Sequence, residues 1–490
     1  MRKAAALALG LATSLLAASP LTEGASAAKQ ATPTLAGRIA AAKTAKQINY
    51  YPSANGWSRM WTSFDPVTIG ADLAKARALG ADSVRVIVFP TVFGYPTPKP
   101  EYAAKLAKFV ELAGRNGMTV KLTLFDWWDG YADVKGSSTW ATALLKPYRN
   151  DKRVISIGLK NELDPSNAAA VAWAKKLLPV VRAVVPATPV TISVSGEAGV
   201  AGLKKLKTLL AATPLDYYDY HFYGNSQNAL ALIRQAQAAV APAPLVIGET
   251  GVSSRSASEG EQAAYLARVF QGAAAAGVRS VAPWTLNDFR TGAIPPSAVA
   301  RSAPQYAYGL YRANGTAKPA AAVVKAAWTG KAYPVGALDL GFENPAGQTP
   351  WTTFMPELGA ATKVRNVAHS GKWSVRLTRT GKNAAGSPSY RVAPLQPVRP
   401  GQTWCAEAWA RGTAATGTTQ VALSWFDVNN RWLGGAGSAT LPTGTTGWTR
   451  LTVAAKAPAG AAGLQLHLKS GANKGSVWFD DVKLSASLSS

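Results

Sequence analysis

Between residues 40 and 330, short runs of β-branched and aromatic residues alternate with longer runs whose apolar residues recur at helical spacing. The short runs predict strands at residues 47–51, 83–89, 119–125, 155–160, 190–195, 217–222, 245–248 and 280–283. Helical patterns separate most of them, at residues 69–79, 102–116, 168–184, 202–212, 229–240 and 259–276, and another helix is predicted at 320–329. Strands joined by helix-length connections form parallel sheets with right-handed crossovers. The pattern therefore predicts an α/β fold, a (β/α)8 TIM barrel, over residues 36–330.

A doubly wound open sheet is the alternative arrangement of the same elements. That fold binds dinucleotides through a G-x-G-x-x-G turn after its first strand, and no such turn follows residue 51. The sequence therefore favours the barrel.

From residue 338 the pattern changes to short strands separated by Gly, Pro and Thr. The predicted strands lie at residues 373–377, 403–410, 420–426, 450–454, 464–468 and 476–484. Closely spaced strands of this kind predict an all-β sandwich over residues 338–487. Residues 331–337, with Pro334 and Gly336, are interpreted as the linker between the two domains.

The N-terminus has the pattern of a secretory signal peptide. A basic start, Met1-Arg2-Lys3, precedes an apolar run over residues 4–18 and small residues that end at Ala25-Ser26-Ala27. A membrane-spanning helix needs about 20 apolar residues, and Ser19-Pro20 interrupts this run earlier. We expect residues 1–27 to be removed, the mature protein to be secreted and extracellular, and no segment to insert into a membrane.

The composition excludes several kinds of disulfide and metal site. Of the 490 residues 48% are hydrophobic and 16 are Trp, enough for sizeable cores. A single cysteine excludes an internal disulfide and a cysteine-based zinc site, and three distant histidines argue against a histidine-rich metal centre. We therefore expect no cofactor for catalysis, and a monomer.

The chain is strongly basic, with 52 Lys and Arg against 26 Asp and Glu and a net charge of +26. A nucleic-acid partner would require clustered basic residues with interleaved aromatics, and only scattered pairs such as Lys204-Lys205 occur. Many basic residues lie on the predicted outer helices. We expect electrostatic attachment to an anionic cell wall or acidic glycan, and no nucleic-acid partner.

Active sites of TIM barrels form at the C-terminal ends of the strands. In this chain those ends carry Arg85, Asp126, Trp127, Trp128, Asn161, Glu162, His221, Tyr223, Glu249, Trp284 and, just beyond, Asn287. Carboxylates beside tryptophans are typical of sugar chemistry, because sugar rings stack on indoles while a carboxyl pair acts on the glycosidic bond.

These strand ends resemble a known superfamily. The supporting stretches are I-N-Y-Y-P at 48–52, S-V-R-V at 83–86, G-L-K-N-E at 158–162, H-F-Y-G at 221–224, V-I-G-E-T-G at 246–251 and A-P-W at 282–284. Together they resemble the clan A retaining glycoside hydrolases, and within that clan family five, of the cellulase and mannanase type. The resemblance implies that Glu162 is the general acid/base and Glu249 the nucleophile.

The same resemblance implies roles for the neighbouring side chains. Arg85 would keep Glu249 ionised and oriented, and Tyr223 would hydrogen-bond it. Asn161 would hold the sugar hydroxyl next to the attacked carbon and His221 would order the acid/base. Trp284 would stack on the sugar at the reacting position.

One departure from the family concerns the third strand, where such enzymes usually carry a histidine. Here the sequence is Leu124-Phe125-Asp126-Trp127-Trp128, so Asp126 or Trp127 would take over that contact. Trp128 and Asn287 are further candidates for substrate binding.

The predicted sandwich resembles the jelly-roll carbohydrate-binding modules of bacterial glycanases. The supporting stretches are L-G-F-E-N at 340–344, A-H-S-G-K-W-S-V at 368–375 and V-W-F-D-D-V at 477–482. Trp351 and Trp432 are the candidates for sugar stacking. The resemblance implies a structural Ca²⁺ held by Glu343 and Asp480, with hydrogen bonds to backbone turns as the alternative.

The leading hypothesis is a secreted retaining β-glycoside hydrolase that cleaves a β-linked polysaccharide, of glucan or mannan type, by double displacement through a covalent glycosyl-enzyme. We expect endo action. The alternative is a non-catalytic secreted protein that binds cell-wall polysaccharide on a barrel scaffold. Release of reducing sugar from a panel of polysaccharides would separate the two.

Overall fold

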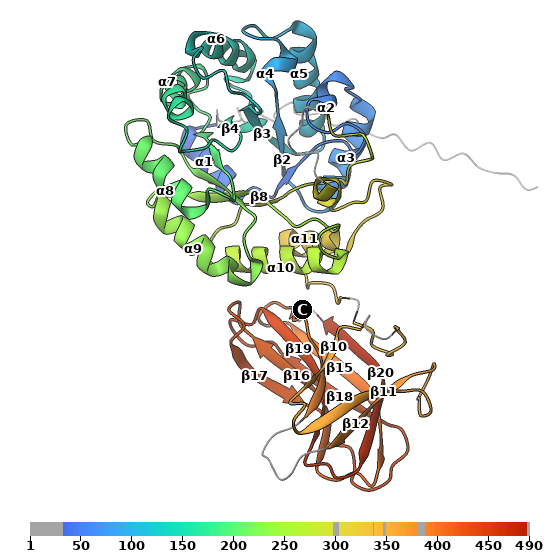
Figure 1. The fold of residues 1–490 in the computed structure, drawn as a ribbon. Helices are drawn as coiled ribbons and strands as arrows, with labels where there is room; N and C mark the ends of the chain where they lie inside the picture. The colour runs from blue at the N-terminus through green and yellow to red at the C-terminus, as the bar shows by residue number, and fades with distance from the viewer. Residues whose placement is uncertain (1–32, 297–302, 337, 346–348, 380–387, 488–490) are drawn as a thin grey trace, which may run out of the picture. The chain divides into compact units, whose positions relative to one another are not determined.

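The computed structural model describes residues 33–296, 303–336, 338–345, 349–379 and 388–487. The predicted signal peptide at residues 1–27 lies outside this part of the chain. Strands surrounded by helices come first and two antiparallel sheets follow (Figure 1). In the described ranges, no helix combines the length and the hydrophobicity that crossing a membrane requires.

Parallel strands form the centre of the first region. They are β1 (Gln47–Asn49), β2 (Ser83–Ile87), β3 (Thr119–Phe125), β4 (Val154–Lys160), β5 (Val190–Thr191), β6 (Ser193–Val194), β7 (Tyr218–Phe222), β8 (Leu245–Thr250) and β9 (Val281–Pro283). They pair in the orders β1-β2-β3-β4-β5 and β6-β7-β8-β9. The predicted fifth strand is split at Ile192, so that one half pairs with β4 and the other with β7.

The barrel closes where β1 approaches β8 and β9. Asn49 Nδ2 donates to the carbonyl oxygens of Gly248, at 2.9 Å, and Pro283, at 3.2 Å. The carbonyl of Asn49 accepts from the amide of Leu286 at 3.1 Å. A buried polar side chain thus joins the first and last strands, which confirms the TIM barrel expected from the sequence.

Helices surround the strands (Figure 1). They are α1 (Leu35–Thr44), α2 (Arg59–Thr62), α3 (Pro66–Ala78), α4 (Pro90–Phe93), α5 (Pro100–Arg115), α6 (Val134–Leu145), α7 (Ala168–Val184), α8 (Gly199–Leu209), α9 (Ala229–Val240), α10 (Glu259–Ala275) and α11 (Pro319–Thr329), with 3-10 turns at Lys146–Tyr148, Ser226–Asn228 and Ala303–Ala307. The sequence pattern did not predict α6, because its first turn contains the weak helix formers Gly136 and Ser137. Asp133 compensates by capping it, since its side chain accepts from the Gly136 amide at 2.8 Å.

An ion pair lies inside the barrel below the strand ends. Lys121 of β3 donates to Asp219 of β7, and each side chain is only 2% exposed. The pKa of Lys121 is lowered by burial, against the attraction of Asp219. Since buried charges need a partner, each residue depends on the other to remain in the core.

Replacing Lys121 by Met would leave the Asp219 carboxylate buried without its cation. We expect the free energy of unfolding to fall by about 3–5 kcal/mol, measured as a lower urea midpoint of the full chain. The exposed Lys204 supplies the matched control, because Lys204→Met should change stability by less than about 0.5 kcal/mol. Equal midpoints for Lys121→Met and the unchanged protein would contradict the dependence.

The second region is a sandwich of antiparallel strands. They are β10 (Trp351–Phe354), β11 (Gly359–Val364), β12 (Ser374–Arg379), β13 (Ser389–Val392), β14 (Gln396–Pro397), β15 (Thr403–Thr413), β16 (Thr418–Phe426), β17 (Trp432–Gly437), β18 (Thr449–Lys456), β19 (Gly463–Gly471) and β20 (Ser476–Ser487). One sheet has the order β10-β13-β19-β16-β17, with β14 on β19, and the other β11-β12-β20-β15-β18. Trp404, Leu423, Leu466 and Phe479 are buried in the core that the two sheets share.

Residue alternation produces this core. In β15 buried and half-buried positions alternate along most of the strand, as expected when one face of a sheet packs on another. The all-β prediction is confirmed. The strands β10, β11, β13, β14 and β17 were not predicted, since they are short or, as in β17, rich in glycine.

Candidate active site

Glu249 lies near the C-terminal end of β8, with 5% of its surface exposed. Arg85 of β2 donates to its Oε1, and the hydroxyl of Tyr223 donates to its Oε2 at 2.9 Å. The preceding residue must be glycine, because a Cβ at Gly248 would lie 1.8 Å from Asp219 Oδ1. Two donors on opposite oxygens therefore hold the carboxylate in one orientation.

Arg85 connects four strands around Glu249. Its Nε donates to Thr123 Oγ1 at 3.0 Å, its Nη1 to Asn49 Oδ1 at 2.9 Å and its Nη2 to Asn161 Oδ1 at 2.6 Å. The residue is 1% exposed. A guanidinium bound on every side cannot turn away, so its charge stays beside Glu249.

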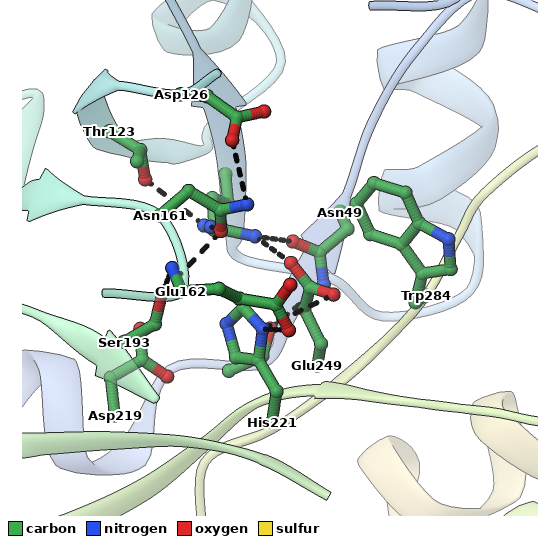
Figure 2. A network of polar contacts seen from close by, with 12 residues as sticks. Asn49, Thr123, Asp126, Asn161, Glu162, Ser193, Asp219, His221, Glu249 and Trp284 are labelled. Carbon is green, nitrogen blue, oxygen red and sulfur yellow. Dashed lines mark hydrogen bonds and ion pairs between the residues drawn. The ribbon is translucent and has the colours of Figure 1, made fainter. Parts of the chain in front are cut away.

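Glu162 follows β4 and faces Glu249 across the barrel mouth (Figure 2). Its backbone has a φ of 44°, an uncommon value for a residue other than glycine, and its amide donates to Ser193 Oγ at 2.8 Å. Its side chain is 37% exposed, in contrast to the buried Glu249. One oxygen of each glutamate lies within 4.8 Å of the other, close to the 5–5.5 Å that carboxyl groups of retaining glycosidases require.

His221 of β7 lies between the two glutamates and is fully buried. Its Nδ1 is 2.9 Å from Glu162 Oε1 and 3.4 Å from Glu249 Oε2. In the described part of the chain, these three residues form the only cluster of His, Cys, Asp and Glu with metal-ligand spacing. Arg85 and Tyr223 already direct hydrogens at the oxygens of Glu249, so the cluster is arranged to hold a proton, and it does not fit a metal ion.

The three groups influence one another's protonation. Burial raises the pKa of Glu249, although His221 and Arg85 oppose this effect. Burial also favours the neutral form of Glu162, but the hydrogen bond and charge of His221 outweigh it and lower its pKa. Burial disfavours the imidazolium, yet the carboxylates of Glu249 and Glu162 raise the pKa of His221. Glu162, His221 and Glu249 therefore titrate as one coupled group.

An aromatic wall adjoins the carboxylates. Trp57 stacks on Trp127 with ring centroids 6.0 Å apart and 9° between the planes, and it meets Trp284 nearly edge-on at 5.8 Å. The indole nitrogen of Trp284 donates to Gln305 at 3.2 Å, which fixes the ring. Trp127 is half-buried, so one part of this wall stays open.

The family model of the cellulases, glycosyl hydrolase family 5, matches residues 42–290, about half of the chain, and the match contains both glutamates. This chain belongs to glycoside hydrolase family 5. No curated protein is found to match it.

Solved structures of family-5 enzymes share the barrel fold. A subfamily-18 enzyme of family 5 from Bifidobacterium longum subsp. infantis is 20% identical, with a TM-score of 0.50, over 58% of this chain and 78% of that one. A subfamily-18 enzyme from Bifidobacterium longum subsp. longum, in complex with Manβ1-4GlcNAc, is 17% identical with a TM-score of 0.50, over 58% and 78%. An exo-β-1,4-mannosidase from an Opitutaceae bacterium is 19% identical with a TM-score of 0.49, and the match spans 58% of this chain and 59% of that enzyme.

The remaining substrate-binding candidates of this family-5 barrel, Asp126, Trp128 and Asn287, differ in where they lie and what they contact. Asp126 is 5% exposed and accepts from Asn161 Nδ2 at 3.0 Å, so it orients Asn161. Trp128 packs on Tyr95, with ring centroids 4.5 Å apart. Asn287 does not line the mouth as expected. It is 2% exposed, and its Nδ2 donates to the Asp72 carboxylate at 2.9 Å within the barrel wall.

The two tryptophans of the sandwich that were expected to stack on sugars differ in their exposure. Trp351 is 3% exposed and donates to the carbonyl of Leu338, so it offers no face to a sugar, which corrects the expectation for this residue. A buried indole at the start of β10 belongs to the core. Trp432, in contrast, is 63% exposed.

The carboxylates expected to hold calcium bind backbone amides. Glu343 Oε1 accepts from the amides of Lys372, at 2.8 Å, and Trp373, at 3.0 Å. Asp480 Oδ2 accepts from the amide of His369 at 2.7 Å, while its Oδ1 accepts from that of Asp481 at 2.7 Å. These contacts support the alternative role, the fixing of turns, and calcium binding stays a prediction.

Sequence reasoning missed four residues that support the site. Asn49 and Thr123 bind Arg85, Ser193 binds the amide of Glu162, and Trp57 extends the aromatic wall. Asn49 ends the first strand, within the family-like stretch I-N-Y-Y-P, so its position was a usable signal. Trp57 lies in a loop and had none.

The hydrogen bond from Tyr223 makes a pH-dependent prediction. It stabilises ionised Glu249, so Tyr223→Phe should raise the pKa of Glu249. Because a nucleophile must be ionised, the acid limb of kcat/KM should move to higher pH by about one to two units, given ~1.5–3 kcal/mol for a hydrogen bond to a charge and ~1.4 kcal/mol per unit.

The control is Tyr308→Phe, since Tyr308 packs edge-on against Tyr223 at 6.2 Å. It should leave the acid limb in place. An acid limb that stays unchanged in Tyr223→Phe as well would contradict the role of the hydroxyl.

Proposed function

We propose that this family-5 retaining β-glycosidase is a secreted enzyme that cleaves β-linked polysaccharide of mannan or glucan type. The observation that carries the proposal is the pair Glu162 and Glu249, with oxygens within 4.8 Å and only the second held by two donors. Retention requires one carboxylate that attacks and one that exchanges protons, at this separation.

In the first step, Glu249 attacks the anomeric carbon and the bond to the leaving oxygen breaks. Arg85 and Tyr223 aim the carboxylate and keep it ionised although burial opposes its charge. Glu162 delivers a proton to the leaving oxygen. A covalent glycosyl-enzyme forms on Glu249.

The proton for Glu162 comes from His221, through the hydrogen bond of 2.9 Å between Nδ1 and Oε1. A bound sugar covers the exposed carboxylate of Glu162, and this loss of water raises its pKa. Substrate binding thus moves the proton to the acid where it is needed.

In the second step, water attacks the glycosyl-enzyme from the side of Glu162. Glu162 now accepts the proton of that water, and Glu249 leaves as the carboxylate. Two inversions at one carbon retain the β configuration.

Two features support a mannose- or glucose-type substrate. In the aromatic wall, Trp57 and Trp284 are buried, at 4% and 6% exposed, and the half-buried Trp127 offers the surface on which a pyranose ring can stack. The Bifidobacterium longum subsp. longum enzyme that shares the fold is complexed with Manβ1-4GlcNAc. We therefore place β-1,4-linked mannosyl chains first among the substrates.

Product analysis on mannan, glucomannan, cellulose and xylan tests the proposal, with Glu249→Gln as the inactive control. Short oligosaccharides from chain interiors would support the endo action expected from the sequence. Monosaccharides from chain ends would support exo action instead. No hydrolysis of any β-glycan, with binding retained, would overturn the proposal in favour of a non-catalytic polysaccharide binder.

Secretion and attachment belong to the same proposal. Mature protein isolated from culture medium should begin near residue 28 if the signal peptide is cut as predicted. The surplus of basic residues would hold the enzyme near anionic cell wall, and this attachment should weaken as salt rises.

A further inference from the structure

The outer face of one sandwich sheet carries ordered rows of polar side chains. In β16 the core side chains Val421, Leu423 and Trp425 alternate with residues on the outer face. Strand pairing places the outer residues in rows across the sheet. The rows are Phe354, Ser389, Lys469 and Gln420, then Arg391, His467, Ala422 and Gly437, then Gln465, Ser424 and Gly435, and finally Phe426 and Trp432.

These rows line a groove with a volume of about 660 Å³, here called the sandwich groove. It exists because β17 lacks side chains where it flanks the rows. A Cβ at Gly437 would lie 3.1 Å from the side-chain oxygen of Gln420, and one at Gly435 would lie 2.6 Å from the Leu423 carbonyl. The volume is in the range of ligand sites, about 300–1,000 Å³.

The floor of the groove contains a polar atom without a partner. His467 is 5% exposed, its Nδ1 is 3.0 Å from Ser389 Oγ, and its Nε2 has no hydrogen-bond partner in the described part of the chain. Burial, with Lys469 and Arg391 nearby, lowers the pKa of His467 to about 3. A neutral buried imidazole with a free nitrogen is suited to a hydrogen bond with a ligand.

The charged side chains that line the groove are all basic. Arg391 and Lys469 are among its lining residues, which include no Asp or Glu. Within the described ranges neither cation forms an ion pair with a carboxylate. Arg391 is held in place by Gln465, to which it donates at 2.9 Å, and its guanidinium lies 4.3 Å from the Phe354 ring centroid. The N–H groups at the edge of this fixed guanidinium that do not bind Gln465 are thus available to an anion.

An aromatic platform closes the other end. Trp432 is 63% exposed and lies opposite Phe426 on the neighbouring strand. The row of Trp432 and Phe426 meets β19 at Gly463, four residues from His467, the partner of Arg391, and six residues from Lys469. At about 3.3 Å per residue, the indole row therefore lies about 13 Å along β19 from the row of Arg391 and about 20 Å from that of Lys469. A chain of linked sugars spans this separation more readily than a small ion does.

We propose that the sandwich groove binds a carboxylate-bearing polysaccharide, with one sugar ring stacked on Trp432 and a uronate carboxylate bound by Arg391 and Lys469. The exposed indole accounts for the sugar and the two unpaired cations for its acid group. This site is distinct from the diffuse positive charge of the chain. It is also independent of the reaction at Glu249.

The test uses the full chain carrying Glu249→Gln, so that binding is measured whether or not the barrel hydrolyses the probe. The probes are polygalacturonate and the same polymer after reduction of its carboxyl groups. At 0.15 M salt, titration calorimetry should show binding to polygalacturonate that is weakened at least tenfold by Arg391→Gln/Lys469→Gln. Trp432→Ala should also weaken it at least tenfold.

The matched control is Lys204→Gln/Lys205→Gln, which removes the same charge from exposed positions of α8. It should leave binding within about twofold, and the reduced polymer should bind at least tenfold more weakly. Equal losses in the two double variants would overturn the proposal, since they would mean attraction by overall charge. Equal binding of both polymers, or no binding, would overturn it too. Circular dichroism identifies any variant that fails to fold. If the double variant Arg391→Gln/Lys469→Gln does not fold, Arg391→Lys replaces it, and we expect it to weaken binding to polygalacturonate partially.

Discussion

Replacement of Glu249 by glycine is expected to lower kcat by roughly 10⁴-fold or more on any glycan that the protein hydrolyses. No other carboxylate can take its place, because the only other one in the cluster, Glu162, lies on the opposite side of the reacting position and faces solvent. Sugar binding should persist, since the aromatic wall is unchanged.

A small anion distinguishes the loss of a nucleophile from a general loss of activity. Azide can enter the space that the side chain leaves and attack from the same side, and its single inversion yields the α-glycosyl azide. The measurement is product configuration by NMR, with an activated aryl glycoside as substrate. Glu101→Gln, at an exposed position of α5, should keep full activity. Normal turnover by Glu249→Gly would contradict the assignment.

The second large effect is expected at Glu162. Glu162→Gln should lower kcat by about 10²–10⁴-fold on natural glycans, the usual contribution of a general acid. The loss in the first step should depend on the leaving group. A dinitrophenyl glycoside needs no proton, so its glycosyl-enzyme should form at a near-normal rate and accumulate as a burst.

Azide also tests the role of Glu162, and the expected product has the opposite anomeric configuration. In Glu162→Ala it should attack the glycosyl-enzyme and yield the β-glycosyl azide, because the nucleophile Glu249 is intact. The same α product from both variants, or equal losses on natural and activated substrates, would show that the two roles are assigned wrongly.

Strand order and the position of the two glutamates at the strand ends could be predicted from the sequence. Buried parallel strands appear as short apolar runs, and a polar residue directly after such a run stands out. Asn161-Glu162 and Glu249 are visible for this reason. Helix α6 and the glycine-rich β17 were missed, because local propensity opposes them and packing against neighbours stabilises them instead.

Side-chain direction could not be predicted where a loop follows the strand. Asn287 was expected in the barrel mouth, but it binds Asp72 in the wall. Trp351 and Trp432 looked alike in the sequence, and packing buries one and exposes the other. The sandwich groove was invisible too, since its members come from five strands and meet only through pairing.

Hydrophobic periodicity and residue type are local properties, so the sequence was enough to predict the barrel, the sandwich and the residues at the strand ends. Which side chains meet depended on the tertiary structure. It placed Arg85 and Tyr223 on Glu249, put His221 between the two glutamates and, within the described ranges, gave the groove of Arg391 and Lys469 no acidic side chain. These contacts join residues far apart in the chain, and their distances and burial depend on how the sheets close and pack.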